Sequence, residues 1–157
     1  MLNHPASRGA VRLASADPRA APLVDPRYLT DERDVAALAH GVARAEALLD
    51  AAVAADGGGG GGGAAADRGG FGGAPPAVAD ACRRRATTLW HFCGTARMGA
   101  DAASVCDERL RVRGVTRLRV ADASVMPLAP GGNTMATTMA IGARCASFIL
   151  EDAGLAR

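Results

Sequence analysis

Lysine is absent from this chain of 157 residues, so all 18 basic side chains are arginines. They are balanced by 16 acidic residues, which leaves a net charge of only +2. Proteins that bind nucleic acid normally carry a basic stripe or patch. The one run of basic residues, at 83–85, is better explained as the solvated face of a helix. The charge pattern therefore predicts no nucleic-acid partner.

Long apolar runs and closely spaced metal ligands are also lacking. No window reaches the roughly 18 apolar residues of a membrane-spanning helix, and the first residues lack the pattern of a secretion signal. The four cysteines, at positions 82, 93, 106 and 145, include no close pair of the kind that zinc sites use. We therefore expect no metal and no membrane span, and we expect free, mostly buried thiols. The cellular compartment is left open.

Aromatic residues make up only 3% of the chain, whereas glycine occurs 20 times. The core must therefore be built from scattered Leu, Val, Ile, Met and Phe side chains. Seven consecutive glycines occupy residues 57–63. Such a run contains the spacing of a dinucleotide-binding loop by accident, but a helix precedes it and more glycine follows it. We expect residues 56–74 to be a flexible linker.

Hydrophobic periodicity outlines the secondary structure on either side of this linker. Alternation predicts a strand over residues 8–14, and residues 22–29 read as an extended connector. Apolar residues at helical spacing predict a helix from Asp31 to about Ala55. The remaining predicted elements are helices at about 76–86 and from Thr134 to near Gly154, and short strands or strand-like runs at 105–112 and 118–120. The fold class is therefore α+β.

Three polar residues are candidates for chemistry. His91 carries an imidazole, a group that can accept a proton near neutral pH, although a lone histidine is more often simply held by one hydrogen bond. Asn133 follows two glycines and precedes a helix, where it is a favourable N-cap. A helix beginning there would also direct free N–H groups toward an anionic ligand. Asp122, at the end of an apolar run, can bind a hydroxyl group or cap a turn.

These residues lie in an ordered series of short blocks. A Trp-His pair at 90–91 precedes Gly-Thr-Ala-Arg-Met-Gly at 94–99. Leu-Arg-Val-Ala-Asp-Ala-Ser follows at 118–124, and Gly-Asn-Thr follows at 132–134. The series resembles the C-terminal end of the GMC (glucose-methanol-choline) family of FAD-dependent oxidoreductases. Residues 5–18 resemble the substrate-domain segment of the same family.

The resemblance implies a role for each matching residue. His91 would accept the hydroxyl proton of an alcohol while a hydride passes from carbon to N5 of FAD. Asn133 would hydrogen-bond the substrate oxygen and hold it in line with His91. Together with these two, the residues at the other matching positions would contact FAD: Trp90, Asp122, Ala123, Thr134 and Met135.

The resemblance also implies a division of the chain. Residues 1–55 would belong to the substrate domain, residues 56–74 would be the linker, and residues 75–157 would carry the catalytic and FAD-contacting blocks. The N-terminal nucleotide-binding unit of the family has no counterpart here. We therefore expect a C-terminal fragment that packs against such an FAD domain and that exposes sheet edges and apolar faces.

Three interpretations of function follow. The chain would be part of an enzyme that oxidises the CH–OH group of a small-molecule alcohol with FAD. Alternatively, it would be a non-catalytic truncated remnant or partial gene model, or it would belong to a lyase or other non-oxidase branch of the same fold. His91 favours alcohol oxidation over a decarboxylase. The sequence identifies neither the substrate nor the electron acceptor, whether oxygen or another molecule.

Overall fold

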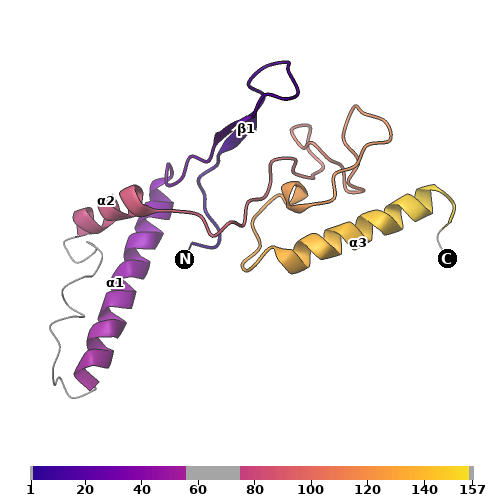
Figure 1. Cartoon of the computed structure of the whole chain (residues 1–157). Helices are drawn as coiled ribbons and strands as arrows, with labels where there is room; N and C mark the ends of the chain where they lie inside the picture. Colours follow the sequence, from indigo (N-terminus) through magenta and orange to yellow (C-terminus); the bar gives the residue numbers. More distant parts are fainter. Residues whose placement is uncertain (1, 56–74, 156–157) are drawn as a thin grey trace. The chain divides into compact units, whose positions relative to one another are not determined.

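The computed structural model describes residues 2–55 and 75–155 and divides the chain into two compact units, unit 1 up to Thr87 and unit 2 from Thr88. The described elements of unit 1 are β1 (Ala10–Arg12), β2 (Leu23–Asp25), α1 (Glu32–Ala55) and α2 (Pro75–Arg85). Those of unit 2 are η1 (Ala123–Val125), which is one turn of 3₁₀ helix, and α3 (Met135–Asp152) (Figure 1). Helices combined with an antiparallel hairpin give the α+β architecture that was predicted.

The predicted first strand forms, but it is short and pairs with a strand that was expected to be only an extended connector. β1 and β2 are antiparallel, with Val11 opposite Val24. Asp17 organises the turn between them, because its carboxylate accepts the N–H of Arg19 and its carbonyl accepts the N–H of Ala20. Three-residue strands are too short to reveal their pairing through hydrophobic alternation.

α1 begins where it was predicted to begin, and a buried carboxylate ties its first turn to the N-terminal segment. Asp34 is only 3% exposed. Its carboxylate accepts the backbone N–H groups of Ala6 and Ser7, both at 2.8 Å, and the hydroxyl of Ser7. The same hydroxyl accepts the N–H of Asp31. A buried charge satisfied in this way fixes residues 5–7 against the start of α1.

α2 also forms as predicted, and it packs on α1 (Figure 1). Val35 of α1 and Val78 and Cys82 of α2 are buried. Arg83 forms a 2.6 Å ion pair with Glu32, so one member of the basic run lies on a helix face, as expected. α2 therefore lies in unit 1, although the sequence grouped it with the C-terminal segment. The predicted linker at residues 56–74 lies outside the described residues.

Of the two forms predicted for residues 105–112 and 118–120, regular strands do not form, and the segments are strand-like runs with isolated bridges. Leu110 and Arg117 have positive φ angles of 63° and 60°. The carboxylate of Asp107 accepts two backbone N–H groups from the first of these segments. Left-handed residues and local side-chain bonds of this kind interrupt a regular ladder.

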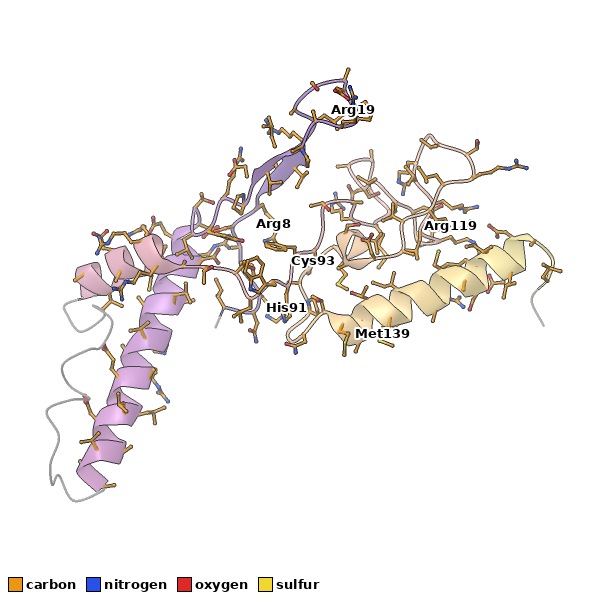
Figure 2. The ribbon with its side chains drawn as sticks, in the orientation of Figure 1. Arg8, Arg19, His91, Cys93, Arg119 and Met139 are labelled. Carbon is orange, nitrogen blue, oxygen red and sulfur yellow. The ribbon has the colours of Figure 1, made fainter. Side chains whose placement is uncertain are left out.

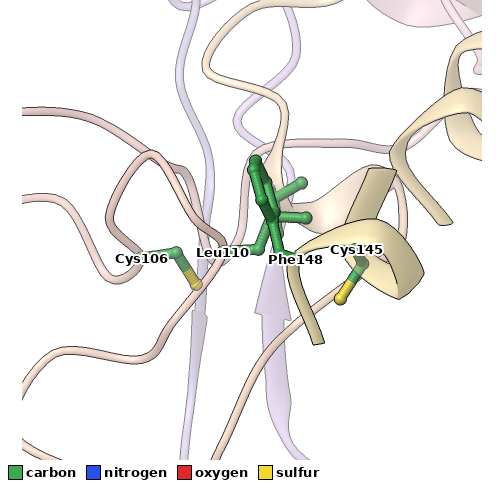
Figure 3. Close-up of a cluster of buried hydrophobic side chains, with 5 residues drawn as sticks. Cys106, Leu110, Cys145 and Phe148 are labelled. Carbon is green, nitrogen blue, oxygen red and sulfur yellow. The ribbon is translucent and has the colours of Figure 1, made fainter. Parts of the chain in front are cut away.

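The core of unit 2 is a cluster of five buried side chains on α3, η1 and the loops (Figure 3). Its members are Cys106, Leu110, Val125, Cys145 and Phe148. All four cysteines of the chain are free thiols, and three of them are buried, as predicted. Burial raises the pKa of Cys106, and the charge of Asp107 acts in the same direction. The thiol therefore serves as a small apolar group in this core.

Charged groups hold the C-terminal end of α3. Arg109 donates to Asp152 at 2.7 Å and to the carbonyl of Phe148 at 3.3 Å, and Arg119 also binds Asp152. The guanidinium groups of Arg109 and Arg144 lie 4.5 Å and 4.3 Å from the centroid of the Phe148 ring. These contacts join α3 to the loops that form the rest of unit 2.

Large apolar side chains are exposed in both units, as expected. In unit 1 they include Leu13, Leu23, Val24, Leu48, Leu49 and Val53. In unit 2 they include Trp90, Phe92, Leu128, Met135 and Met139. Across residues 2–55 and 75–155, no helix has the length and apolar character to cross a membrane.

Replacing Asp34 by Asn should lower the free energy of unfolding by about 2 kcal/mol at neutral pH, because the charged acceptor of several buried hydrogen bonds is lost. Burial raises the pKa of Asp34, but the hydrogen bonds from Ala6 and Ser7 outweigh it, and the net pKa lies below 3.8. The stabilisation is therefore present above about pH 4 and is lost as the pH falls through the lowered pKa. Urea unfolding followed by circular dichroism measures it.

Asp17→Asn is the control, because this carboxylate is exposed and the asparagine oxygen can still accept the N–H of Arg19 in the hairpin turn. It should leave the unfolding curve unchanged. An Asp34→Asn variant that lost as much stability at pH 2 as at pH 7 would contradict the role of the carboxylate charge.

Candidate active site

The side chains of His91 and Asn133 meet although 42 residues separate them in sequence. Nε2 of His91 lies 3.0 Å from Oδ1 of Asn133. His91 is half-buried, and Asn133 is exposed. Figure 2 shows His91 beside the loop that enters α3. The structure therefore brings together the two residues that the sequence singled out as catalytic candidates.

Backbone hydrogen bonds hold the two regions in place. The N–H groups of Gly94, Ala96 and Met98 donate to the carbonyls of three consecutive residues, 123–125, at 3.3, 2.9 and 2.8 Å. The segment that follows His91, which includes a turn at residues 95–96, is thus hydrogen-bonded along η1. Because Val125 is fully buried in the core of unit 2, these bonds fix the histidine segment to that core.

Gly94 is required by the backbone at this attachment. Its φ angle is +88°, a conformation that L side chains rarely adopt. A Cβ added here would also lie 3.3 Å from the carbonyl oxygen of Met126. The first residue of the Gly-Thr-Ala-Arg-Met-Gly block therefore serves the turn that follows His91.

Arg97 closes the other end of that block. Its guanidinium binds Asp101 through two hydrogen bonds of 2.8 and 2.7 Å. The hydrogen bond from Arg97 lowers the pKa of Asp101 to about 2, so the pair is charged at any ordinary pH. The loop between these residues is further closed by the hydroxyl of Ser104, which donates to the carbonyl of Gly99 at 2.9 Å.

The predicted N-cap role of Asn133 is wrong. Thr134 is the residue that precedes the first turn of α3, and its side chain makes no capping hydrogen bond. The amide of Asn133 contacts His91 instead. As a result, the first N–H groups of α3 have no side-chain cap at Thr134, and a positively polarised helix end lies directly after Asn133.

Asp122 adopts the capping role, one of the two roles that the sequence allowed. It precedes η1, and its carboxylate accepts the N–H of Ser124 at 2.8 Å. Hydrogen bonds from Ser124 lower the pKa of Asp122. Ala123, the first residue of η1, accepts the N–H of Gly94 through its carbonyl, so both residues belong to the attachment of the histidine segment.

Trp90 and Met135 are largely exposed, at 77% and 72%. The Trp90 ring touches Phe92 edge to face, with centroids 6.2 Å apart. The backbone of Trp90 has a φ of +64°, which costs a non-glycine residue about 1–2 kcal/mol. Its N–H donates to the hydroxyl oxygen of Thr88 at 2.9 Å.

Sequence reasoning missed Thr88 and the conformational role of Gly94. A threonine or serine whose hydroxyl accepts the N–H two residues later forms a recognised local turn. The Thr-x-Trp spacing therefore contained a signal for this hydrogen bond. Nothing in the spacing indicated that the turn would point the next residue, His91, at Asn133.

The arrangement pairs a proton acceptor with an amide beside exposed apolar side chains and a helix N-terminus. An imidazole can take a proton, and an amide can both donate and accept hydrogen bonds. Within the part of the chain that the structure describes, no group of three or more His, Cys, Asp or Glu side chains could hold a metal ion. The candidate site is therefore described by its histidine, its asparagine and the α3 terminus.

Comparison with protein families gives a match over residues 5–142, to a family model described as GMC oxidoreductase. The chain is 39% identical over 152 residues to an alcohol dehydrogenase [acceptor] of Pseudomonas putida, covering 97% of this chain and 27% of that protein. It is 41% identical over 152 residues to a choline oxidase of Arthrobacter globiformis, covering 94% and 27%.

Among solved structures, an FAD-dependent oxidoreductase from Chaetomium thermophilum is similar, with a TM-score of 0.80 and 27% identity. The similarity covers 98% of this chain and 26% of that one. The chain thus spans about a quarter of the length of the proteins that it matches.

Replacing Gly94 by Ala should lower the free energy of unfolding of unit 2 by about 1–2 kcal/mol, because alanine is strained at positive φ. Gly142→Ala is the matched control: this glycine lies inside α3, and its added Cβ would meet nothing within 4 Å. Alanine there should raise stability by about 0.5–1 kcal/mol. Urea unfolding compares the two variants, and a stabilising effect of Gly94→Ala would contradict the strained turn.

Proposed function

Because the chain belongs to the GMC oxidoreductase family, we propose that unit 2 supplies the proton-accepting part of a flavin-dependent site. The substrate is an alcohol whose CH–OH group is oxidised. His91 is the proton acceptor, and Asn133 orients the substrate oxygen. The relatives named alcohol dehydrogenase [acceptor] and choline oxidase support a CH–OH donor.

The observation that carries the proposal is the 3.0 Å contact between His91 Nε2 and Asn133 Oδ1. In this contact the ring nitrogen donates and the amide oxygen accepts. In the other tautomer of His91 the proton sits on Nδ1 and Nε2 has a free lone pair, and the Asn133 amide, turned over, offers its N–H donors. An alcohol oxygen between the two side chains would then donate its proton to Nε2 and accept a hydrogen bond from the amide of Asn133.

This geometry accounts for the use of two residues rather than one. The histidine can hold the hydroxyl proton only if the oxygen is held at hydrogen-bond distance. Asn133 supplies that restraint from a separate segment, the loop that enters α3. The substrate oxygen would therefore be hydrogen-bonded by His91 and by Asn133. Both side chains retain solvent access, which leaves room for a small molecule to reach them.

The residues present also fit a flavin. Bound FAD would supply the group that accepts the hydride. The uncapped start of α3 offers N–H groups and a positive dipole end to an electron-rich ring edge. Trp90 and Met135 present exposed apolar surface that a planar ring system could cover. Thr134 directly precedes Met135, and Asp122 and Ala123 lie at the start of η1, to which the segment after His91 is hydrogen-bonded.

Membership of the GMC family also suggests a role for each part of the chain. Residues 1–55 would contribute to the substrate domain, and residues 75–157 would contain the catalytic and flavin-contacting blocks. Residues 56–74 would connect them as a linker. An FAD-binding domain would be the packing partner of the exposed apolar side chains.

A chimera tests the proposal: this chain replaces the matching 27% of the Pseudomonas putida relative. Flavin reduction by primary alcohols is followed without oxygen in a stopped-flow instrument. His91→Ala should slow reduction by about 100-fold or more, because general-base catalysis is lost. Asn133→Ala should slow it by about 100-fold because the substrate oxygen is no longer aligned. Flavin content should stay the same in both variants.

His40→Ala is the control, since His40 is an exposed residue of α1. Its reduction rate should match that of the parent chimera. If His91→Ala retained the parent rate with full flavin content, the proposed base would be wrong. A folded chimera that bound flavin but was reduced by no alcohol would favour the non-catalytic or lyase interpretation.

A further inference from the structure

We propose that Thr88 is a positioning residue, whose hydroxyl holds Trp90 in a left-handed turn and thereby points His91 at Asn133. The inference rests on the proposed function only in giving the His91–Asn133 pair a chemical purpose. The hydroxyl oxygen of Thr88 accepts the N–H of Trp90 at 2.9 Å. Trp90, at φ +64°, directly precedes His91.

Something must hold Trp90 in this conformation, because a bulky residue at positive φ is strained. Packing of its own side chain is a poor explanation. The indole is 77% exposed, and its ring contact is with Phe92, itself 59% exposed. The hydrogen bond from its backbone N–H to Thr88 is the local restraint that remains.

Two of the four other non-glycine residues with positive φ in the described part of the chain support this reading. Leu110 has a φ of 63°, but it is buried in the core of unit 2, which fixes it by packing. Arg27 has a φ of 47° and is exposed, like Trp90. Its N–H also donates to a side-chain oxygen two residues earlier, Oδ1 of Asp25 at 3.3 Å. The exposed left-handed residue Arg27 thus makes the same kind of N–H to side-chain hydrogen bond as Trp90.

The left-handed turn at Trp90 affects His91 because the backbone is also held in place beyond His91. From Gly94 onward the backbone is hydrogen-bonded to residues 123–125. Only residues 91–93 lie between that attachment and the left-handed turn. Only these three residues can absorb a change of φ at Trp90, so we expect such a change to redirect the side chain of His91. Loss of the Thr88 acceptor should break the 3.0 Å contact with Asn133.

The test uses nuclear magnetic resonance of the whole chain without flavin or substrate. Two signals are measured: the one-bond Cα–Hα coupling of Trp90, which reports the sign of φ, and the nuclear Overhauser effect between the His91 ring and the Asn133 amide. Thr88→Val removes the acceptor at almost constant volume. The Trp90 coupling should change to its value for negative φ, and the His91–Asn133 Overhauser effect should be lost. Thr88→Ser retains the hydroxyl and should retain both. Unchanged amide signals of Val125 and Phe148 show that unit 2 is folded.

A second variant tests the route through the backbone of Trp90. Glycine adopts positive φ without strain, so adding Trp90→Gly to Thr88→Val should restore part of the His91–Asn133 effect. Persistence of the effect in Thr88→Val, its absence from the parent chain, or no recovery in the double variant would each overturn the proposal.

The same substitution in the chimera separates this inference from the proposed function. Thr88→Val should slow flavin reduction there, and Thr88→Ser should restore it. If Thr88→Val abolished the His91–Asn133 effect but left reduction unchanged, the proposed function would fail, and the positioning by Thr88 would stand.

Discussion

The candidate site depends on the hydrogen bonds that join residues 94–98 to the carbonyls of residues 123–125. They connect the segment that carries His91 to η1, which is rooted in the core by Val125. Asn133 follows the same η1 region along the chain, so η1 helps to position both side chains. Without this attachment, a contact between residues 42 positions apart would have no support.

α3 completes the frame because it is fixed at one end and open at the other. Cys145 and Phe148 place its middle and C-terminal part in the core, and Asp152 is bound by two arginines. Its N-terminus has no side-chain cap at Thr134. A helix held in this way presents a fixed dipole end beside Asn133, which suits a site where negative charge is to be stabilised.

One of the five non-glycine residues with positive φ among the described residues, Trp90, lies at the proposed site. Trp90 and Gly94, on either side of the His91 segment, both have positive φ angles. At Trp90 the hydroxyl of Thr88 accepts the backbone N–H, and Gly94 is a glycine, which adopts positive φ without strain. Strain that persists at an exposed position, where packing does not impose it, is typical of a segment whose direction matters. We infer that the turns on both sides of His91 together direct its side chain toward Asn133.

The sequence by itself determined the helices, the free thiols, the family resemblance and the identity of the candidate residues. Helix signals act over a few residues, so α1 and α3 lie where their apolar spacing predicted them, and α2 lies where its N-terminal prolines predicted it. The tertiary structure decided three things: the pairing of β2, the choice of isolated bridges over regular strands at 105–112 and 118–120, and the contact of Asn133 with His91 in place of capping. In each case a partner distant along the chain, or a left-handed residue such as Leu110, outweighed the local preference. Only folding brings His91 to Asn133, because backbone bonds between segments far apart in sequence leave no periodic trace in the residues that they join.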